Sequence, residues 1–345
     1  MNRPPKILLA FLLPLMISCE KFFIEADQAN TNVNKFKLLC TEIDEKYSFF
    51  QYKNINWDSV YHVYRPQISN EMTSREFFDI MAAMLNELRD GHVTLYSGFD
   101  RSQNYEWYAN YPANFSLATV QANYLGEGFF NTGPFLSQII DSVGYIYSGS
   151  FANEIRRGDV DTIIDRFSDL KGIIFDVRDN TGGMSKTGRM IASAFADSIR
   201  LVSYTLYKTG PGHGDFSEPQ PNYISPQGNR QFLKPVVVLS NRRTYSATND
   251  FVLYMSAFHH VIIMGDQTGG GGGTPYDYEL LNGWRCRFPR TQTLGVNGLN
   301  IEHGIAPTIR VNIRPADERN GIDTIIETAL IYINQTSSDY NGYTP

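Results

Sequence analysis

The feature that most constrains the fold is a strand–turn–helix unit between Pro235 and Phe258. The apolar, β-branched run 236–239 is typical of a buried parallel strand. After a polar turn, apolar residues recur at helical spacing up to Phe258. Ser246 lies where the turn becomes the helix, so its hydroxyl would be exposed beside the first free backbone N–H groups. This position suits a nucleophile that shares its site with part of an oxyanion hole, or a serine that simply caps the helix.

Residues 1–18 are expected to be a bacterial lipoprotein signal peptide that lies outside the fold. Arg3 and Lys6 precede an apolar run that ends at Ile17, and Ser18 stands just before Cys19. The run is too short to cross a bilayer. We therefore expect Cys19 to carry lipid and to anchor the protein in the cell envelope, at the outer membrane or the periplasmic face. An ordinary secretory signal with cleavage elsewhere is the alternative.

Charge and cysteine content narrow the range of partners. The chain has 30 Lys and Arg against 36 Asp and Glu, a net charge of −6, and no basic run beyond the signal segment. Nucleic acid is therefore not an expected partner. The histidines lack ligand spacing, so neither a metal nor a cofactor is expected. Cys40 and Cys286 are far apart and are predicted to be buried free thiols. The sequence does not indicate an oligomeric state.

Four regions follow from the patterning along the chain. Residues 1–18 form the signal peptide, 19–33 a polar tether, 34–92 an N-terminal helical lobe and 93–345 a catalytic domain. Beyond residue 93, apolar strand-like segments alternate with helical ones, which predicts an α/β fold. Strands are expected near 93–97, 114–121, 125–130, 143–149, 172–178, 200–208 and 261–266, and helices over 153–167, 184–199 and 321–333.

Three further segments carry candidate functional residues. His92 stands in LRDGHVTL, at the junction of the predicted lobe and the first strand, and Glu302 precedes a Gly-Ile-Ala-Pro turn. The segment GIIFDVRDNTGGM is an apolar strand followed by a turn with Gly182 and Gly183. Asp176 and Arg178, at the end of that strand, are predicted to form a structural ion pair. The five-glycine run 269–273 is either a mobile loop or part of the site.

Together these segments resemble the motifs of the tail-specific (C-terminal processing) serine proteases and the tricorn protease core. The resemblance runs from about Phe36 to Pro315 and implies a crotonase-like, Clp-protease-like catalytic domain. It also implies that Ser246 is the nucleophile, His92 the general base and Glu302 the carboxylate that orients the imidazole. The Ser246 hydroxyl and the His92 ring are expected to lie within about 4 Å, with Glu302 at the other ring nitrogen. No metal is implied.

The resemblance also separates two catalytic solutions within the family. One uses a lysine roughly two dozen residues after the serine, but this chain has no lysine after Lys234. Hydrolysis is therefore expected not to depend on any lysine, with a base that titrates as a histidine does. The oxyanion hole is expected to use the N–H group of Ala247 and one from Gly182 or Gly183.

Besides Thr181, which stands where the family pattern has the first glycine of the turn, the chain departs from that pattern at two positions. Gly91 stands where the tricorn-like pattern has a serine, and Asn249 stands where many processing proteases have a glutamate. A typical PDZ module does not fit between Leu95 and Val143. The function expected is a serine peptidase that cleaves peptides or unfolded proteins in the cell envelope. The alternative is an inactive family member that binds a peptide or a hydrophobic ligand.

Overall fold

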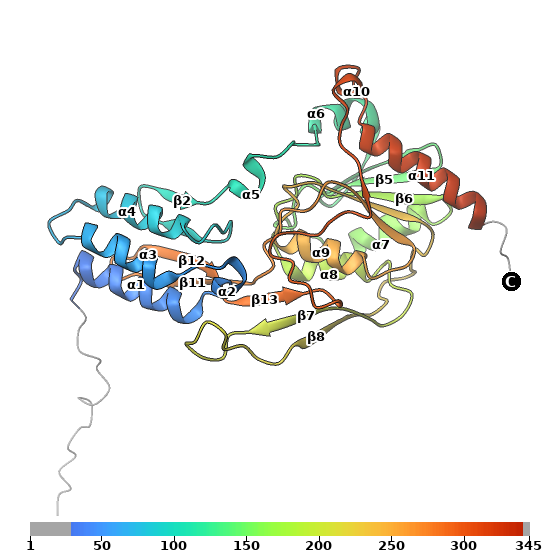
Figure 1. Cartoon of the computed structure of the whole chain (residues 1–345). Coiled ribbons are helices and arrows are strands. Elements are labelled where there is room, and N and C mark those ends of the chain that lie inside the picture. The colour runs from blue at the N-terminus through green and yellow to red at the C-terminus, as the bar shows by residue number, and fades with distance from the viewer. Residues whose placement is uncertain (1–28, 341–345) are drawn as a thin grey trace, which may run out of the picture.

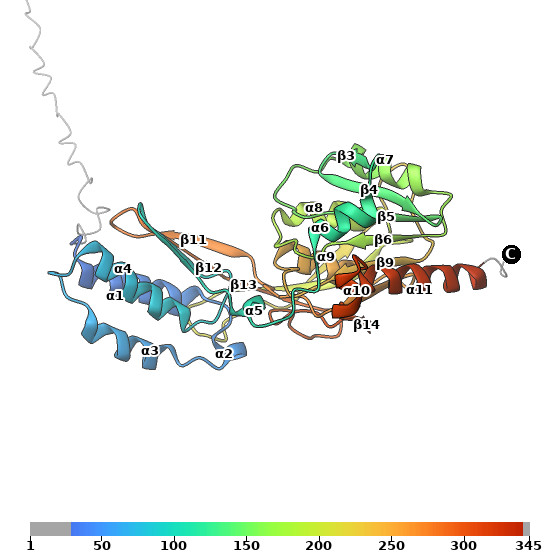
Figure 2. The ribbon, with the colours of Figure 1, turned by 90° about the horizontal axis from the view of Figure 1, so that it is seen from above.

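The computed structural model describes residues 29–340, which form a helical lobe and a larger α/β domain lying side by side (Figures 1 and 2). The predicted signal peptide and Cys19 lie outside the described residues. Within residues 29–340, no helix is both long enough and apolar enough to cross a membrane.

The helices are the following: α1 (Asn32–Lys46), α2 (Phe50–Lys53), α3 (Trp57–Tyr64), the 3₁₀ turn η2 (Arg65–Gln67), α4 (Ser74–Asn86), α5 (Glu106–Ala109), α6 (Leu117–Thr119), the π-helical turn η3 (Val120–Leu125), α7 (Arg157–Phe167), α8 (Ser185–Ala192), α9 (Ala247–Met255), α10 (Pro315–Arg319) and α11 (Thr324–Tyr340).

The strands are the following: β1 (Thr94–Tyr96), β2 (Arg101–Gln103), β3 (Phe130–Thr132), β4 (Phe135–Ile140), β5 (Val143–Tyr147), β6 (Gly172–Asp176), β7 (Arg200–Tyr207), β8 (Gln220–Ile224), β9 (Val236–Ser240), β10 (Val261–Gly265), β11 (Pro275–Glu279), β12 (Arg285–Pro289), β13 (Thr291–Leu294) and β14 (Ile309–Arg310).

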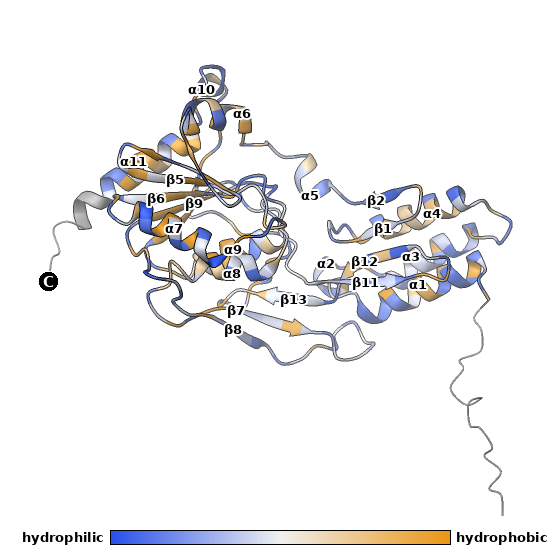
Figure 3. Ribbon diagram, turned by 180° about the vertical axis from the view of Figure 1, so that it is seen from behind, coloured by the Kyte–Doolittle hydropathy of each residue, from blue (hydrophilic) through white to orange (hydrophobic). Residues whose placement is uncertain are grey.

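A seven-stranded sheet, in the order β14-β10-β9-β6-β5-β4-β3, forms the centre of the α/β domain. Five of its strands, β5, β6, β9, β10 and β14, are parallel to one another. Strands β3 and β4 are added antiparallel at the other edge. Strand β9 is buried on both faces, because Val236 and Val238 pack in one core and Val237 and Leu239 in the other. Helices α7, α8 and α9 cover the first face and α11 the second (Figure 1). Figure 3 shows β6 and β9 as strongly hydrophobic strands between these layers.

The lobe is built from two distant parts of the chain. Helices α1 to α4 pack on a second sheet, in the order β11-β12-β1-β2, and the side chains of Leu280, Trp284 and Phe288 complete their core. Cys40 and Cys286 are both buried in that core as free thiols, as predicted. The lobe therefore extends past residue 92, and it includes strands that return from the α/β domain.

The strand predicted over residues 114–121 is wrong. Ser116 caps a short helix there, since its hydroxyl accepts the N–H of Thr119 at 3.3 Å. The chain then continues as η3, whose Val120 and Tyr124, one turn apart, both enter the core beneath α11. A helical spacing of buried groups and a local cap outweigh the β-branched composition of this segment.

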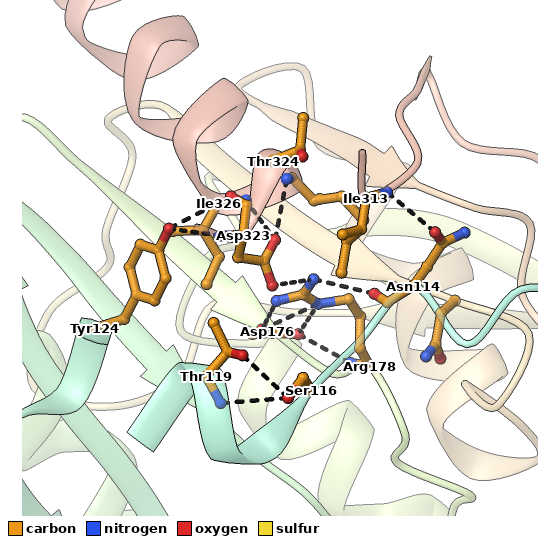
Figure 4. Close-up of polar contacts among 12 residues, drawn as sticks. Asn114, Ser116, Thr119, Tyr124, Asp176, Arg178, Ile313, Asp323, Thr324 and Ile326 are labelled. Atoms are coloured by element: carbon orange, nitrogen blue, oxygen red, sulfur yellow. Dashed lines mark hydrogen bonds and ion pairs between the residues drawn. The ribbon is translucent and has the colours of Figure 1, made fainter. Parts of the chain in front are cut away.

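Arg178 is the largest fully buried side chain in the described part of the protein. Its guanidinium pairs with Asp176 at 2.6 Å and with Asp323 at 2.8 Å, and it donates to the carbonyl oxygen of Asn114 at 3.2 Å (Figure 4). The predicted structural ion pair is therefore confirmed. The network ties the end of β6 to the segment that precedes α11.

Replacing Arg178 by methionine should destabilise the fold strongly, because two carboxylates would remain buried without a cation. We expect Arg178→Met to lower the free energy of unfolding by about 3–5 kcal/mol in urea denaturation. The control is Arg156→Met, which breaks an exposed pair with Glu154 (3.2 Å) and should leave the free energy of unfolding close to that of wild type. Equal effects of the two substitutions would contradict this account.

Candidate active site

Ser246 lies in a strained turn between β9 and α9. Its backbone angles, φ 57° and ψ −128°, are unusual for a residue with a side chain. Its hydroxyl makes no capping hydrogen bond to α9, although the residue stands at the N-cap position. The hydroxyl is instead 2.8 Å from Nε2 of His92. The capping interpretation of this serine is therefore wrong, and the expected approach of His92 is confirmed.

The glycine run 269–273 braces this turn and is buried throughout. The carbonyl oxygen of Gly270 accepts the N–H of Ser246 at 2.9 Å, and the N–H of Gly271 donates to the carbonyl oxygen of Glu302 at 3.0 Å. A Cβ on Gly270 would lie 1.8 Å from that same Glu302 oxygen. The run is therefore a packed support for the serine, and the alternative of a mobile loop is excluded.

His92 is positioned by a local turn and by an aromatic neighbour. Its backbone N–H donates to Oδ1 of Asp90 at 2.8 Å, and its ring lies 4.9 Å from the ring of Tyr245. Burial lowers the pKa of His92 to about 4, and the opposing effect of Asp90 is smaller. His92 is therefore neutral near pH 7, with Nε2 free to accept the serine proton. Nδ1 is buried and has no hydrogen-bond partner among residues 29–340.

The expected hydrogen bond between Glu302 and His92 is not formed. Oε1 of Glu302 lies 2.7 Å from Nζ of Lys53, and Oε2 accepts the N–H of Gly272 at 2.9 Å. Both carboxylate oxygens are therefore engaged away from the imidazole. The physical reason is the buried ammonium group of Lys53, which attracts the carboxylate more strongly than a neutral ring N–H does.

Lys53 joins the carboxylates of Asp90 and Glu302 in one buried network. Its ammonium group is 2.8 Å from Oδ2 of Asp90, and that oxygen also accepts the hydroxyl of Tyr47 at 2.8 Å. Burial opposes the ionisation of Asp90, but Lys53 outweighs it and holds the pKa of that carboxyl below its ordinary value. Burial raises the pKa of Glu302 to about 7, with Lys53 opposing. Glu302 therefore reaches His92 only indirectly, through Lys53 and Asp90.

Sequence reasoning missed both Lys53 and Asp90. Asp90 had a usable signal, since an aspartate two residues before a histidine commonly accepts its backbone N–H. Lys53 had none, because it ends α2 in a different part of the chain. The absence of lysine after Lys234 correctly directed attention to His92, but the expectation that no lysine matters did not foresee Lys53.

The three candidate oxyanion-hole residues are not equivalent. The N–H of Gly182 donates to Oδ1 of Asn180 at 3.0 Å, so it is not available to an oxyanion. Ala247 opens α9, where backbone N–H groups lack intrahelical partners. Gly183 and Ala247 both line the pocket beside Ser246. A Cβ on Gly183 would lie 2.1 Å from the backbone nitrogen of Ala152, so only glycine fits there.

The two departures from the family pattern each have a structural explanation. A Cβ on Gly91 would lie 2.5 Å from the indole nitrogen of Trp107 and 2.7 Å from the hydroxyl of Tyr245, which leaves no space for a serine. Asn249 donates to the carbonyl oxygen of Ile301 at 3.2 Å. Asn249 thereby holds the segment that carries Glu302 against α9.

A pocket of about 600 Å³ opens in front of Ser246, lined by residues of the lobe and of the α/β domain. His92, Gln103 and Arg287 line it from the lobe, and Gly183, Ala247 and Asp250 line it from the α/β domain. Among residues 29–340, no group of three or more His, Cys, Asp or Glu side chains is placed to hold a metal ion. The arrangement offers a neutral base at a strained serine, with backbone donors beside it.

Two models of known protein families match the chain. The model of peptidase family S41 matches residues 142–311, and the model of the tricorn protease C1 domain matches residues 31–86. The first region covers the central sheet from β5 to β14 and includes Ser246 and Glu302. The second covers the helices of the lobe, so both parts of the molecule have known relatives.

Individual proteins are similar over different shares of the chain. A crystal structure of a candidate peptidase from Parabacteroides merdae is 43% identical, with a TM-score of 0.84, and the match covers 88% of this chain and 96% of that one. Carboxyl-terminal-processing peptidase 1, chloroplastic, of Arabidopsis thaliana is 32% identical over 172 residues, which are 47% of this chain. The chain spans about a third of that relative's length, since the match covers 32% of it.

The crystal structure of the tricorn protease resembles the chain in fold alone. It is 14% identical, with a TM-score of 0.53, and the match covers 90% of this chain and 37% of that one. With these similarities, the expected crotonase-like, Clp-protease-like fold with a helical N-terminal lobe is confirmed.

Replacing Lys53 by methionine should disturb the position of His92, because Asp90 and Glu302 would be buried without their cation. We expect Lys53→Met to lower the free energy of unfolding by about 3–5 kcal/mol in urea denaturation. The control is Lys46→Met, in the same lobe, which breaks the partly exposed pair with Glu42 and should cost less than about 1 kcal/mol. A Lys53→Met variant as stable as the control would show that burying Asp90 and Glu302 without their cation does not destabilise the fold.

Proposed function

The chain belongs to peptidase family S41, and on this premise we propose that it is a serine peptidase that cleaves peptides or unfolded proteins through an acyl-enzyme. The observation that carries the proposal is the 2.8 Å contact between Nε2 of His92 and Oγ of Ser246. Support also comes from the backbone of the serine, whose positive φ of 57° presents the hydroxyl to the pocket instead of to the helix.

In the first half of the reaction, Oγ of Ser246 attacks the carbonyl carbon of the substrate peptide bond. The serine proton passes to Nε2 of His92 as the new C–O bond forms. Negative charge develops on the carbonyl oxygen, and the N–H groups of Ala247 and Gly183 are placed to stabilise it. His92 then returns the proton to the leaving nitrogen as the C–N bond breaks, which leaves an ester on Ser246.

In the second half, water takes the place of the released amine. His92 accepts a proton from the water as the water oxygen attacks the ester carbonyl carbon. The bond to Oγ breaks, and the proton returns to Ser246, so that the free enzyme and a carboxylic acid product result. Burial keeps the pKa of His92 at about 4, and the base is therefore in its neutral form across the neutral pH range.

In this proposal Glu302 is a positioning residue and does not touch the imidazole. It balances the charge of Lys53, which holds Asp90, and Asp90 fixes the backbone N–H of His92. The charged groups keep the turn at residues 90–92 in one conformation. This differs from the direct carboxylate–imidazole contact expected from the resemblance.

We also propose that the peptidase acts in the cell envelope of a bacterium, held at the membrane by lipid on Cys19. The basis is the sequence alone, a short apolar run that ends in Ser18-Cys19. The inactive-binder alternative has no observation in its favour, since Ser246 and His92 are in contact.

Removing the nucleophile or the base should abolish hydrolysis of fluorescently labelled unfolded casein. We expect Ser246→Ala and His92→Ala each to lower kcat/KM by about 10³ or more, because the two residues act as a unit. In wild type, the His92 ring itself should stay neutral between pH 6 and pH 8, because burial lowers its pKa to about 4, and NMR of the ring protons would show this.

The control for this experiment is His62→Ala, which changes an exposed histidine of α3 and should retain wild-type activity. Full activity of His92→Ala would mean that another group is the base. A midpoint between pH 6 and pH 7 in the titration of the His92 ring would show that it titrates as an exposed histidine does. Binding of casein without cleavage by wild type would favour the inactive-binder alternative.

Labelling of Cys19 tests the anchor. Cells fed with an alkyne-tagged fatty acid should label the wild-type protein and not Cys19→Ala, because the thiol is the proposed attachment point. Cys40→Ala serves as the matched cysteine control and should still be labelled. Equal labelling of Cys19→Ala, or recovery of the wild type without detergent, contradicts the proposal.

A further inference from the structure

Asp250 is an acidic side chain of the pocket that the reaction described above does not use. It lies one turn beyond the nucleophile in α9, and its backbone N–H donates to the carbonyl oxygen of Ser246 at 3.0 Å. Its side chain lines the same 600 Å³ pocket as Ser246 and Ala247. Its Oδ1 atom is buried and has no hydrogen-bond partner among the described residues.

No cation in the described part of the chain forms an ion pair with Asp250. Within residues 29–340 it forms no ion pair, and the charge that acts on it is that of Arg189. Arg189 is engaged elsewhere, since its guanidinium donates to the carbonyl oxygen of Tyr223 at 2.7 Å and lies over the ring of Tyr254. Burial raises the pKa of Asp250 to about 7, which is the expected consequence of a carboxyl group without a partner.

The side of the pocket on which Asp250 lies follows from the chemistry of the reaction. His92 gives its proton to the leaving amine, so the leaving part of the substrate lies on the lobe side, near His92 and Arg287. The acyl part directs its carbonyl oxygen toward Gly183 and Ala247. Asp250 and Ala247 both belong to α9, on the α/β side of the pocket, and in this orientation the acyl part of the substrate would occupy that side.

The remaining residues of that wall are small. Thr181, Gly183 and Ser185 line the pocket from the α/β domain, as Asp250 does. The arginines of the pocket, which are Arg101, Arg243 and Arg287, come from the lobe and from the turn before Ser246. A long side chain on the α/β side of the pocket would therefore find small residues and one unpaired carboxyl group.

From this placement we infer that Asp250 selects substrates with lysine or arginine on the N-terminal side of the scissile bond. The inference rests on the proposed peptidase function and adds a substrate class to it. A bound ammonium or guanidinium group would supply the charge partner that the carboxyl group lacks, in a charge-assisted contact. A neutral side chain of equal length would leave the carboxyl group unpaired.

The test compares two fluorogenic peptides that differ only in lysine or norleucine before the cleaved bond. In the wild-type full chain, kcat/KM for the lysine peptide should exceed that for the norleucine peptide by about tenfold or more, as expected for one charged hydrogen-bonded contact. In Asp250→Asn this ratio should fall by about tenfold. Asp165→Asn, which changes an exposed helical acid paired with Arg230 at 3.1 Å, should keep the wild-type ratio.

Binding to Ser246→Ala gives a second measurement that needs no turnover. The lysine peptide should bind this variant about tenfold more tightly than the norleucine peptide, and Asp250→Asn in the same background should remove the difference. The inference would be overturned if the lysine-to-norleucine ratio of kcat/KM were the same in wild type and Asp250→Asn, and if the two peptides bound Ser246→Ala equally.

Failure of the proposed function is distinguishable from failure of this inference. If a fluorophosphonate probe labels wild type at Ser246 and peptides are cleaved without charge preference, only the role of Asp250 is wrong. If wild type neither reacts with the probe nor cleaves any peptide, the peptidase proposal is wrong. The binding measurement then decides whether Asp250 recognises a basic side chain.

Discussion

One buried ammonium group joins the two halves of the candidate active site. Lys53 and Asp90 belong to the lobe and Glu302 to the α/β domain, and the three side chains meet within 2.8 Å. A lone buried charge costs several kcal/mol, so each half of this contact depends on the other. The position of His92 therefore depends on the balance of charge among the three buried groups as well as on its hydrogen bond with Ser246.

Local pattern was enough to predict the turn that carries Ser246. The apolar strand before Ser246 and the helical spacing after it required a sharp turn at the serine, and the structure has that turn. The same reasoning found the parallel strands and the buried thiols, because each depends on neighbours in the sequence or on simple apolarity.

Contacts between distant segments were not predictable in the same way. Glu302 was assigned to His92 by resemblance, but Lys53, more than two hundred residues earlier, takes its carboxylate. Gly182 was a reasonable oxyanion donor until the side chain of Asn180 was seen to accept its N–H. In both cases the hydrogen-bond partner is a polar side chain that lies nearby in the folded structure. The local sequence pattern does not indicate that side chain.

The divided construction of the lobe has a consequence for biosynthesis. Its helices are made first, but the strands Pro275–Glu279 and Arg285–Pro289 that complete its core follow the whole central part of the α/β domain. At about 5–20 residues per second this delay is on the order of ten seconds or more. A nascent chain thus has His92 long before it has the strands that close the lobe, whereas Ser246 precedes those strands by only about 30 residues, so the two side chains can be held together only after Pro289 has been made.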